Sequence, residues 1–541
     1  MPDTSQDSKI KKSVILSGLV GTGGLFVAKL IGIIYAIPFS SILSNVDYMG
    51  YYGQAYNIYS YVLNIFTAGF PFAIATMVSK YMTLNDPKTV QLVKKISLNM
   101  LMLMGFVGMV LLMAFSGVIA PLMVATGAET MARVLRILAL AIFLVPTLSA
   151  FRGYYEGQKE MKEYAYSQVF EQFFRVGFLL GAACLLVYVM HWARVWALYA
   201  SVLSTSVAAL AGILQIRHFD KKADADVKEQ ARRQTTPSKS KKEITRELFR
   251  LALPYMLVSI VGYSQQIYNA ILLPTGLKMF YSNTDIISSI ISATTYVGTK
   301  ITAIPMVLAP GFVAAIIPHV TSALTEKNQK LVRKNVVDCL TAVLYIGLPV
   351  CMCIFVYAEP INYTLFYTDD LSTSTMVLQW MTIEALTGTF SPVVTNLMMA
   401  LGLRRSNIRN ICINAVVKGI LMVPFTAMWG FGGAVIASFI ADGWVIWASL
   451  HEIRHKFHIR YNRIFQVVLR TLIGCLVLWG VSYALTRLGL GGVGDGKMIS
   501  FVKMCFNGLI SLIAFMAVTI ALKVPQLALH MKFGLPKRRQ S

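Results

Sequence analysis

Long apolar stretches alternate with short polar or charged segments along the chain, from residue 13 to residue 522. Each holds about 20 mostly apolar residues, the length that a helix needs to cross the hydrocarbon core of a bilayer. The stretches occupy residues 13–41, 54–80, 97–120, 133–155, 164–189, 194–216, 248–273, 291–320, 333–357, 374–401, 408–428, 431–450, 464–487 and 498–522. The pattern predicts an all-α polytopic membrane protein with 14 transmembrane helices. The first stretch is too long for the apolar region of a signal peptide, so it counts as a helix.

The composition agrees with a membrane protein, because 56% of the residues are hydrophobic and only 14% are charged. The net charge of +24 is concentrated in alternate loops. When the N-terminus is placed in the cytoplasm, most of the 49 Lys and Arg residues fall on the cytoplasmic side. This is the positive-inside pattern of proteins in the cell membrane. We therefore expect both termini in the cytoplasm, and the charge excess indicates topology rather than a nucleic-acid partner.

One cytoplasmic segment interrupts the apolar pattern. Residues 220–246, "DKKADADVKEQARRQTTPSKSKKEITR", are highly charged and contain no aromatic residue, so we expect a flexible linker. The predicted parts are an N-terminal lobe with six spans (1–217), the linker (218–247), a C-terminal lobe with six spans (248–452), and two further spans with a basic cytoplasmic tail (453–541).

The two lobes share features in the same order. Residues 68–95 and residues 310–335 each contain a Gly-Phe pair, an apolar run, a hydroxyl-rich helix end and a basic amphipathic loop. Six spans make up each copy, so both copies have the same orientation in the membrane. This predicts a parallel repeat with a pseudo-two-fold axis along the membrane normal. Two such lobes with a cavity between them are typical of alternating-access transporters.

Charged residues occur inside the predicted spans, where a charge costs roughly 2.5 kcal/mol or more at a helix centre. Glu171 and Arg175 lie four residues apart and share one face of the fifth span. At that spacing they can neutralise each other, and the arginine can also extend towards the membrane interface. We therefore expect a structural ion pair that holds the helix in place.

Lys29 in the first span and Lys300 in the eighth span have no acidic residue in their own spans. A lysine at that depth faces a polar cavity or a partner on another helix. One interpretation is a salt bridge with Glu384 or Asp442. The other is a cavity in which both ammonium groups bind a polyanion such as a diphosphate, because lysine binds phosphate as a point charge. Three prolines in the eighth span, at 305, 310 and 318, favour a cavity wall there.

A second polar set lies in the later spans: Glu384, Lys418 and Asp442. The two carboxylates are candidates for coupling transport to H⁺ or Na⁺, and a mutual salt bridge with Lys418 is an equally good interpretation. Gln266 and Asn269 in the seventh span could line the cavity or join helices.

No metal or other cofactor is expected. "HEIRH" at 451–455 matches the HExxH zinc-protease pattern, but it lies at the end of a span among basic residues, and no third ligand stands out. Six of the seven cysteines lie well inside spans, which indicates small apolar helix residues rather than a disulfide framework.

The stretch "FRGYYEGQKEMKEYAYSQVFEQFFRV" (151–176) resembles the signature of bacterial lipid-linked oligosaccharide flippases of the SpoVB/MurJ type, within the MATE-like multidrug/oligosaccharidyl-lipid/polysaccharide superfamily. "AKLIGIIYAIPF" in the first span and "GFGGAVIASFIADG" in the twelfth are similar as well. The resemblance implies 14 spans in two lobes and transport of lipid II, an undecaprenyl-diphosphate-linked peptidoglycan precursor, from the inner to the outer leaflet. It also implies that Lys29 and Lys300 take the places of cationic residues that bind the diphosphate. The better-studied branch has arginine there and a further arginine in the second span, where this chain has Leu63 or Asn64.

We therefore expect a transporter in the bacterial cell membrane and not an enzyme. Its partners would be the lipid-linked glycan, membrane lipids and the cell-wall synthesis machinery, with the membrane potential, H⁺ or Na⁺ as driving force. A flippase for another lipid-linked polymer, of the teichoic acid, capsule or spore cortex type, remains an alternative. A MATE-like drug or cation antiporter is a further one, but it would place an acid in the first lobe. A membrane enzyme would need outer carboxylates, for which "YTDD" (367–370) is the notable cluster.

Overall fold

A computed structural model describes residues 31–32, 34–67 and 69–530. Within these residues the secondary structure is entirely helical, which confirms the predicted fold class. Nine of the described helical segments are long and apolar enough to cross a membrane. The chain forms two compact units that divide between Ile271 and Leu272.

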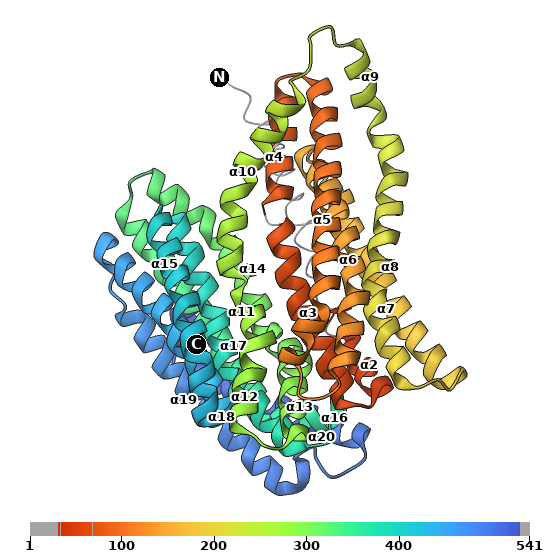
Figure 1. Cartoon of the computed structure of the whole chain (residues 1–541). Helices are drawn as coiled ribbons and strands as arrows, with labels where there is room; N and C mark the ends of the chain where they lie inside the picture. The colour runs from red at the N-terminus through yellow and green to blue at the C-terminus, as the bar shows by residue number, and fades with distance from the viewer. Residues whose placement is uncertain (1–30, 33, 68, 531–541) are drawn as a thin grey trace, which may run out of the picture. The chain divides into compact units, whose positions relative to one another are not determined.

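The first unit contains a bundle of long helices around a buried core. Its helical segments are α2 (Ala36–Leu43), α3 (Val46–Thr67), α4 (Phe70–Thr83), α5 (Pro87–Met123), α6 (Ala128–Gly157), α7 (Met161–Cys184), its π-helical extension η1 (Leu185–Val189), α8 (Arg194–Ala223), α9 (Ala225–Arg233), α10 (Lys241–Gly262), α11 (Ser264–Ile267) and η2 (Tyr268–Leu272). In this unit α5 lies along α6 and α7 lies along α8 (Figure 1). Each of the second to sixth predicted spans therefore corresponds to a described helix or a broken pair.

Two glycines of this bundle stand where a helix is broken and where two helices come close together. Gly69 has a φ of +79° and separates α3 from α4, so the second predicted span is a broken helix. Gly153 of α6 lies so close to α4 that a Cβ atom would stand 2.8 Å from the backbone of Pro71. The glycine of the "FRG" motif is therefore a contact point between two helices, where a side chain would push them apart.

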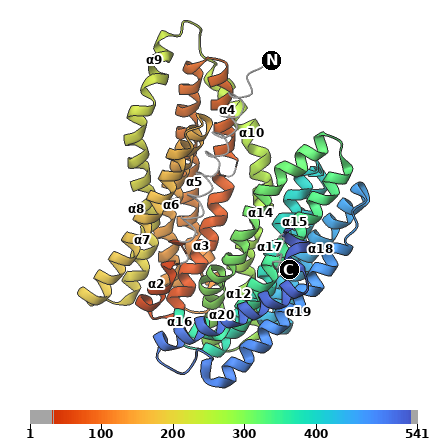
Figure 2. The same cartoon turned by 180° about the vertical axis from the view of Figure 1, so that it is seen from behind.

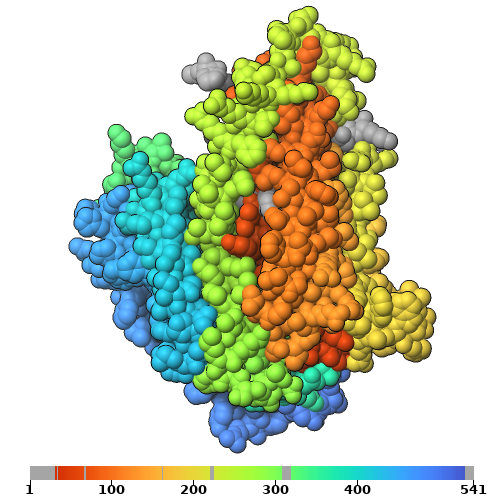
Figure 3. Space-filling view, in the orientation of Figure 1, coloured from red at the N-terminus to blue at the C-terminus, as the bar shows by residue number. Residues whose placement is uncertain are grey.

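The outer surface of the bundle is apolar, as expected for a surface in contact with lipid. Along α5 the side chains of Leu103, Phe106, Val110, Phe115 and Val118 are exposed. Figure 3 shows this part of the chain (orange) on the outside of the unit. On the inner side, Phe70, Ile74, Tyr154 and Tyr155 are buried in a core that α10 also joins. The polar residues within spans therefore stand out against an apolar exterior.

Most of residues 218–247, predicted as a flexible linker, are helical and attached to the bundle. Asp224, at the junction of α8 and α9, is 1% exposed. It accepts hydrogen bonds from Lys94 Nζ (2.8 Å), Gln91 Nε2 (2.8 Å) and Tyr154 Oη (2.6 Å). Burial alone would raise the pKa of Asp224, but these hydrogen bonds and the charge of Lys94 outweigh it and lower the pKa below its ordinary value of 3.8.

The rest of this segment is attached in the same way. The side-chain amide of Gln234 donates to Asp86 (2.8 Å) and its carbonyl accepts from the backbone N–H of Lys88 (2.9 Å). On α10, Glu247 accepts from Lys80 Nζ (2.7 Å) and from Tyr81 Oη (2.6 Å) on α4. The seventh predicted span therefore packs with the first unit, whereas the sequence assigned it to the C-terminal lobe.

The second unit contains α12 (Leu273–Phe280), α13 (Thr284–Ser292), η3 (Ala293–Gly298), α14 (Thr299–Thr325), α15 (Gln329–Val356), α16 (Ala358–Leu365), α17 (Leu371–Ala400), α18 (Arg404–Phe457), α19 (Asn462–Leu485), η4 (Thr486–Leu490), α20 (Lys497–Ala521) and α21 (Val524–Leu529). The eleventh and twelfth predicted spans together form α18, which is bent where Trp429 and Gly430 leave the helical conformation. Helices α19 and α20 lie side by side, as the blue ribbons of Figure 2 show. These segments account for the eighth to fourteenth predicted spans.

Candidate functional site

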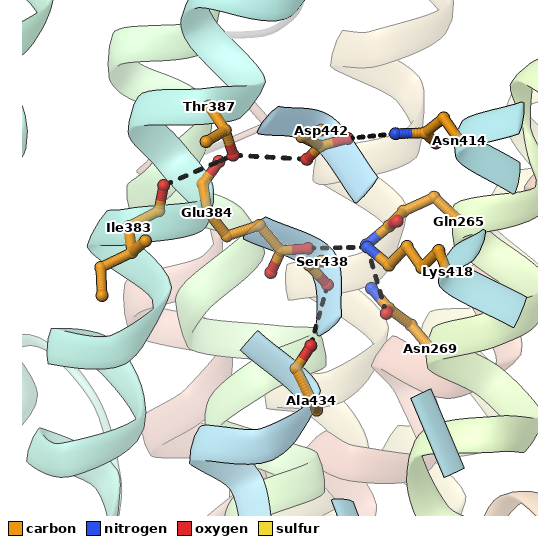
Figure 4. A network of polar contacts seen from close by, with 10 residues as sticks. All are labelled: Gln265, Asn269, Ile383, Glu384, Thr387, Asn414, Lys418, Ala434, Ser438 and Asp442. Carbon is orange, nitrogen blue, oxygen red and sulfur yellow. Dashed lines mark hydrogen bonds and ion pairs between the residues drawn. The ribbon is translucent and has the colours of Figure 1, made fainter. Parts of the chain in front are cut away.

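An ion pair lies inside the second unit between two membrane spans. Lys418 of α18 and Glu384 of α17 are 3.2 Å apart, and their side chains are 2% and 18% exposed. The structure thus bears out the salt bridge that the sequence offered as one interpretation of this set. Figure 4 shows the two side chains pointing at each other from facing helices.

The second carboxylate of this network has neutral partners. Asp442 accepts a hydrogen bond from Asn414 Nδ2 (2.8 Å) and one from Thr387 Oγ1 (3.3 Å). Its charge also interacts with Lys418 and Glu384. Two carboxylates therefore share the neighbourhood of one ammonium group (Figure 4), so the ionised network carries one net negative charge. Such a set can hold one further cation or proton.

Sequence reasoning found the charged members of this network and missed the neutral ones. Asn414 lies four residues before Lys418, so both share one face of α18, and this spacing could have indicated it. Thr387 lies three residues after Glu384 on α17 in the same way. Both positions carry polar side chains within otherwise apolar spans.

Of the two lysines proposed for a diphosphate, the structure places one. Lys300 stands at the beginning of α14, directly after the π-helical segment η3, and is partly exposed. Pro305 lies one turn further along and is buried. Lys29 lies outside the described residues. Their joint role stays a prediction.

In the first unit, α3 has a polar face within a membrane span. Asn57, Ser60, Tyr61 and Asn64 follow each other at helical spacing and are all partly exposed. The residues of the seventh span, Gln266 and Asn269, lie on α11 and η2, and α11 packs on α3. The side chain of Asn269 accepts a hydrogen bond from Gln265 Nε2 (3.3 Å), as Figure 4 shows. Polar faces in spans are typical of helices that line an aqueous cavity.

Gln266 is different, because its side-chain carbonyl oxygen is buried and has no hydrogen-bond partner among the described residues. A buried acceptor of this kind costs about 1–3 kcal/mol when it stays unpaired. Water or a polar ligand group would satisfy it. This is consistent with the predicted cavity role of the seventh span, which stays a prediction.

The expected ion pair between Glu171 and Arg175 differs in the structure. Glu171 pairs with Arg152 of α6, at 2.7 Å from Nη2 to Oε2, and Arg152 also donates to Ser167. The i,i+4 spacing pointed to Arg175, but an arginine 19 residues away on the neighbouring helix takes the carboxylate. This contact between α6 and α7 is the structural pair.

Arg175 is surrounded by tyrosines instead. Its guanidinium carbon lies 4.9 Å from the ring centroid of Tyr56, and its Nε is buried without a hydrogen-bond partner among the described residues. A cation–π contact contributes about 0.5–2 kcal/mol, whereas a charge at the centre of a span costs roughly 2.5 kcal/mol or more. The ring contact alone therefore does not offset the cost of the guanidinium.

Within the described part of the chain, no three His, Cys, Asp or Glu side chains form a group that could bind a metal ion. In the "HEIRH" segment, Glu452 accepts a hydrogen bond from Ser406 Oγ (2.7 Å) and forms an ion pair with Lys456 (3.7 Å). Its carboxylate thus has protein partners at the C-terminal end of α18.

Comparison with known proteins finds a matching family and relatives that cover most of the chain. The model of a family described as polysaccharide biosynthesis protein matches residues 15–324. The lipid II flippase MurJ of Bacillus subtilis (strain 168) is 27% identical over 506 residues, which cover 90% of this chain and 91% of that protein. Stage V sporulation protein B of the same organism is 21% identical over 444 residues, with 82% and 83% covered. These matches confirm the resemblance carried by residues 151–176.

Solved structures show the same fold. Lipid II flippase MurJ in an inward closed conformation superposes with a TM-score of 0.65 at 12% identity, covering 94% of this chain and 99% of that one. A multidrug resistance MATE family transporter of the MOP superfamily, in an inward-facing conformation, gives 0.64 at 16% identity, with 79% and 95% covered. The 14-helix architecture predicted from hydropathy is consistent with these neighbours.

Proposed function

Because the chain belongs to the polysaccharide biosynthesis protein family, we propose that it is a flippase that moves an undecaprenyl-diphosphate-linked glycan from the inner to the outer leaflet. The carrying observation is the similarity to the lipid II flippase MurJ over about nine-tenths of both chains. Its relatives and structural neighbours are transporters rather than enzymes. The substrate that this similarity favours is lipid II, the peptidoglycan precursor.

Two other substrates are less well supported. A related lipid-linked polymer would fit the same chemistry, since the diphosphate and the polyprenyl chain are shared. A drug or cation antiporter would need an accessible acid in the first lobe. The only acidic residue in the first six predicted spans is Glu171, and its carboxylate is paired with Arg152. That pairing favours an anionic substrate.

In the proposed mechanism the cationic side chains Lys29 and Lys300 bind the diphosphate, which offsets part of the cost of removing it from water. The two lobes alternate in exposing the cavity to each side, while the polyprenyl tail stays in the bilayer. Because the cytoplasm is electrically negative, each negative charge that crosses the full field outward gains about 2.3 kcal/mol per 100 mV. The network of Glu384, Lys418 and Asp442 would couple the cycle to H⁺ or Na⁺.

The test is transport by the purified protein in vesicles. Fluorescent lipid II is incorporated into both leaflets, and a membrane-impermeant quencher reports the fraction that reaches the outer leaflet with time. We expect the protein to accelerate this exchange above that in protein-free vesicles. A parallel assay with a lipid-linked teichoic acid precursor assigns the head group. Exchange of neither lipid, together with proton-driven uptake of a cationic dye, would overturn the flippase in favour of the antiporter.

A further inference from the structure

Arg175 lies near mid-depth of the membrane in the first unit. In the candidate span Lys162–Val189 it lies 13 positions after the first residue and 14 before the last, so about 20 Å of helix extends on either side of it. A bilayer's hydrocarbon core is about 30 Å thick, so neither interface is close to its Cα atom. The residue as a whole is partly exposed, whereas its Nε is buried.

The charge of Arg175 has no acidic counterpart in these spans. Glu171, the only acid in the first six predicted spans, forms its ion pair with Arg152 at 2.7 Å. Arg152 and Glu171 neutralise each other. The guanidinium of Arg175 therefore keeps its positive charge without an acidic partner in these spans. The first predicted span supplies no acidic partner for Arg175 either, because residues 13–41 contain neither Asp nor Glu.

Tyrosine rings surround Arg175, and one of its hydrogen-bond donors, Nε, has no partner among the described residues. The ring of Tyr56 faces the guanidinium, and Tyr52, Tyr35 and Tyr59 lie near it. The hydroxyls of Tyr35 and Tyr52 are hydrogen-bonded to each other at 2.9 Å, and the Tyr56 hydroxyl is bonded to Thr205. These contacts fix the rings around the guanidinium. Nε of Arg175 has no partner among the residues that the structure describes.

The same helix that carries Tyr56 presents the polar face of α3. Asn57 follows Tyr56 directly and begins the partly exposed row of Asn57, Ser60, Tyr61 and Asn64. A head group at this face would meet amide and hydroxyl groups of the helix whose Tyr56 contacts the guanidinium. Guanidinium is planar and matches the oxygens of a phosphate or carboxylate with two parallel hydrogen bonds.

We propose that Arg175, held by Tyr56 and its neighbouring tyrosines, is a substrate-binding residue of the first unit and contacts the diphosphate of the lipid-linked substrate. The proposal rests on the proposed flippase function and names the residue that serves it. It also reassigns Arg175 from the structural role that its spacing from Glu171 predicted. The shared chemistry is that of a phosphate oxyanion, whether it comes from a lipid or from a free anion.

The experiment measures binding to the purified full-length protein in detergent, with undecaprenyl diphosphate in one arm and inorganic pyrophosphate in the other. We expect wild type to bind the lipid, and Arg175→Gln to bind it at least tenfold more weakly. Arg175→Lys keeps the charge but not the two parallel hydrogen bonds, so we expect an intermediate affinity. The matched control is Arg133→Gln, which removes an exposed arginine of the same unit that is paired with Glu129. We expect that variant to keep wild-type affinity.

Equal affinity of wild type and Arg175→Gln for the lipid would overturn this inference and leave the flippase proposal standing. Wild type that binds neither ligand would overturn both. Arg175-dependent binding of pyrophosphate without binding of the lipid would overturn the assignment to the transported substrate. If Arg175→Gln does not fold, Arg175→Lys decides the matter, and unchanged affinity in that variant overturns the inference.

Discussion

Lys418→Met should destabilise the second unit far more than the double variant that combines Lys418→Met with Glu384→Gln. The Lys418 ammonium lies 3.2 Å from the Glu384 carboxylate, and the two side chains are only 2% and 18% exposed. Lys418→Met therefore leaves a largely buried carboxylate without its cation, which typically costs about 3–5 kcal/mol. Methionine at 418 and glutamine at 384 remove both charges of the pair, and Asp442 keeps its hydrogen bonds from Asn414 and Thr387, so the double variant should recover the part of that loss that is due to Glu384.

Thermal unfolding of the purified protein in detergent measures this difference. At about 2–4 °C per kcal/mol for chains of 150–250 residues, the single variant should unfold on the order of 10 °C below wild type. The control is Lys503→Met, which removes the partner of Asp495 in an ion pair of 2.6 Å whose side chains are 31% and 42% exposed. An exposed pair contributes about 1 kcal/mol or less. Equal stability of the Lys418 and Lys503 variants would refute the reasoning.

The double variant also separates the two interpretations of the network. If the pair only holds α17 against α18, the double variant regains both stability and transport. If the pair takes part in coupling, stability returns while the dependence of transport on H⁺ or Na⁺ is lost. Vesicle transport with and without an ion gradient distinguishes these results.

Three further predictions concern other parts of the chain. Lys29→Ala or Lys300→Ala should abolish complementation of a flippase-depleted cell at normal protein abundance, and full growth of both variants would refute the cationic role. Asp224→Asn should cost about 3 kcal/mol, because it leaves Lys94 without its buried carboxylate. The pKa of Asp224 is lowered in the folded protein, so its contribution to the free energy of unfolding is complete above about pH 4 and is lost as the pH falls further. The stability of Asp224→Asn should therefore fall less steeply than that of wild type in acid. Gly430→Ala should destabilise the bend of α18, where φ is +61°, whereas Gly443→Ala has open space for the methyl group and should change the melting temperature little.

Hydropathy was sufficient to predict the helices, because a bilayer demands about 20 apolar residues per span whatever the tertiary contacts are. It could not predict how the helices group. The seventh span joins the first unit through Glu247, which binds Lys80 and Tyr81 on α4, and such pairings between distant residues leave no local pattern. The contacts of the predicted linker leave no local pattern for a similar reason. Its composition is typical of disorder, but one carboxylate, Asp224, is buried by three donors from two other helices.

The charged residues in the spans show the same limit. A mutual salt bridge of Lys418 with Glu384 and Asp442 was one of two interpretations of this set, and the structure has the ion pair between Lys418 and Glu384. Glu171 had two arginines within reach of its helix. Spacing along the chain favoured Arg175, but the α6–α7 contact brings Arg152 to the carboxylate. Spacing along the chain predicts contacts within a single helix, whereas the partner of Glu171 depends on how two helices, α6 and α7, pack together.

The charge balance of the two proposed sites leads to a final prediction. Arg175 adds one positive charge to the proposed diphosphate site, and the ionised network of Glu384, Lys418 and Asp442 carries one negative charge. The negative charges of the diphosphate would be balanced by Arg175 together with the proposed Lys29 and Lys300, and a proton or Na⁺ would neutralise the network. A transporter passes through states from which water is excluded, and a buried unpaired charge is costly there. Occupation of both sites should therefore favour the transition more than occupation of either one. Binding linkage requires the effect to be reciprocal: the cation should increase the affinity for the lipid diphosphate by the same factor by which the lipid increases the affinity for the cation. Titration of lipid binding against pH and Na⁺, in wild type and in Asp442→Asn, measures this factor. A factor of one in the wild type would show that the two charges are independent.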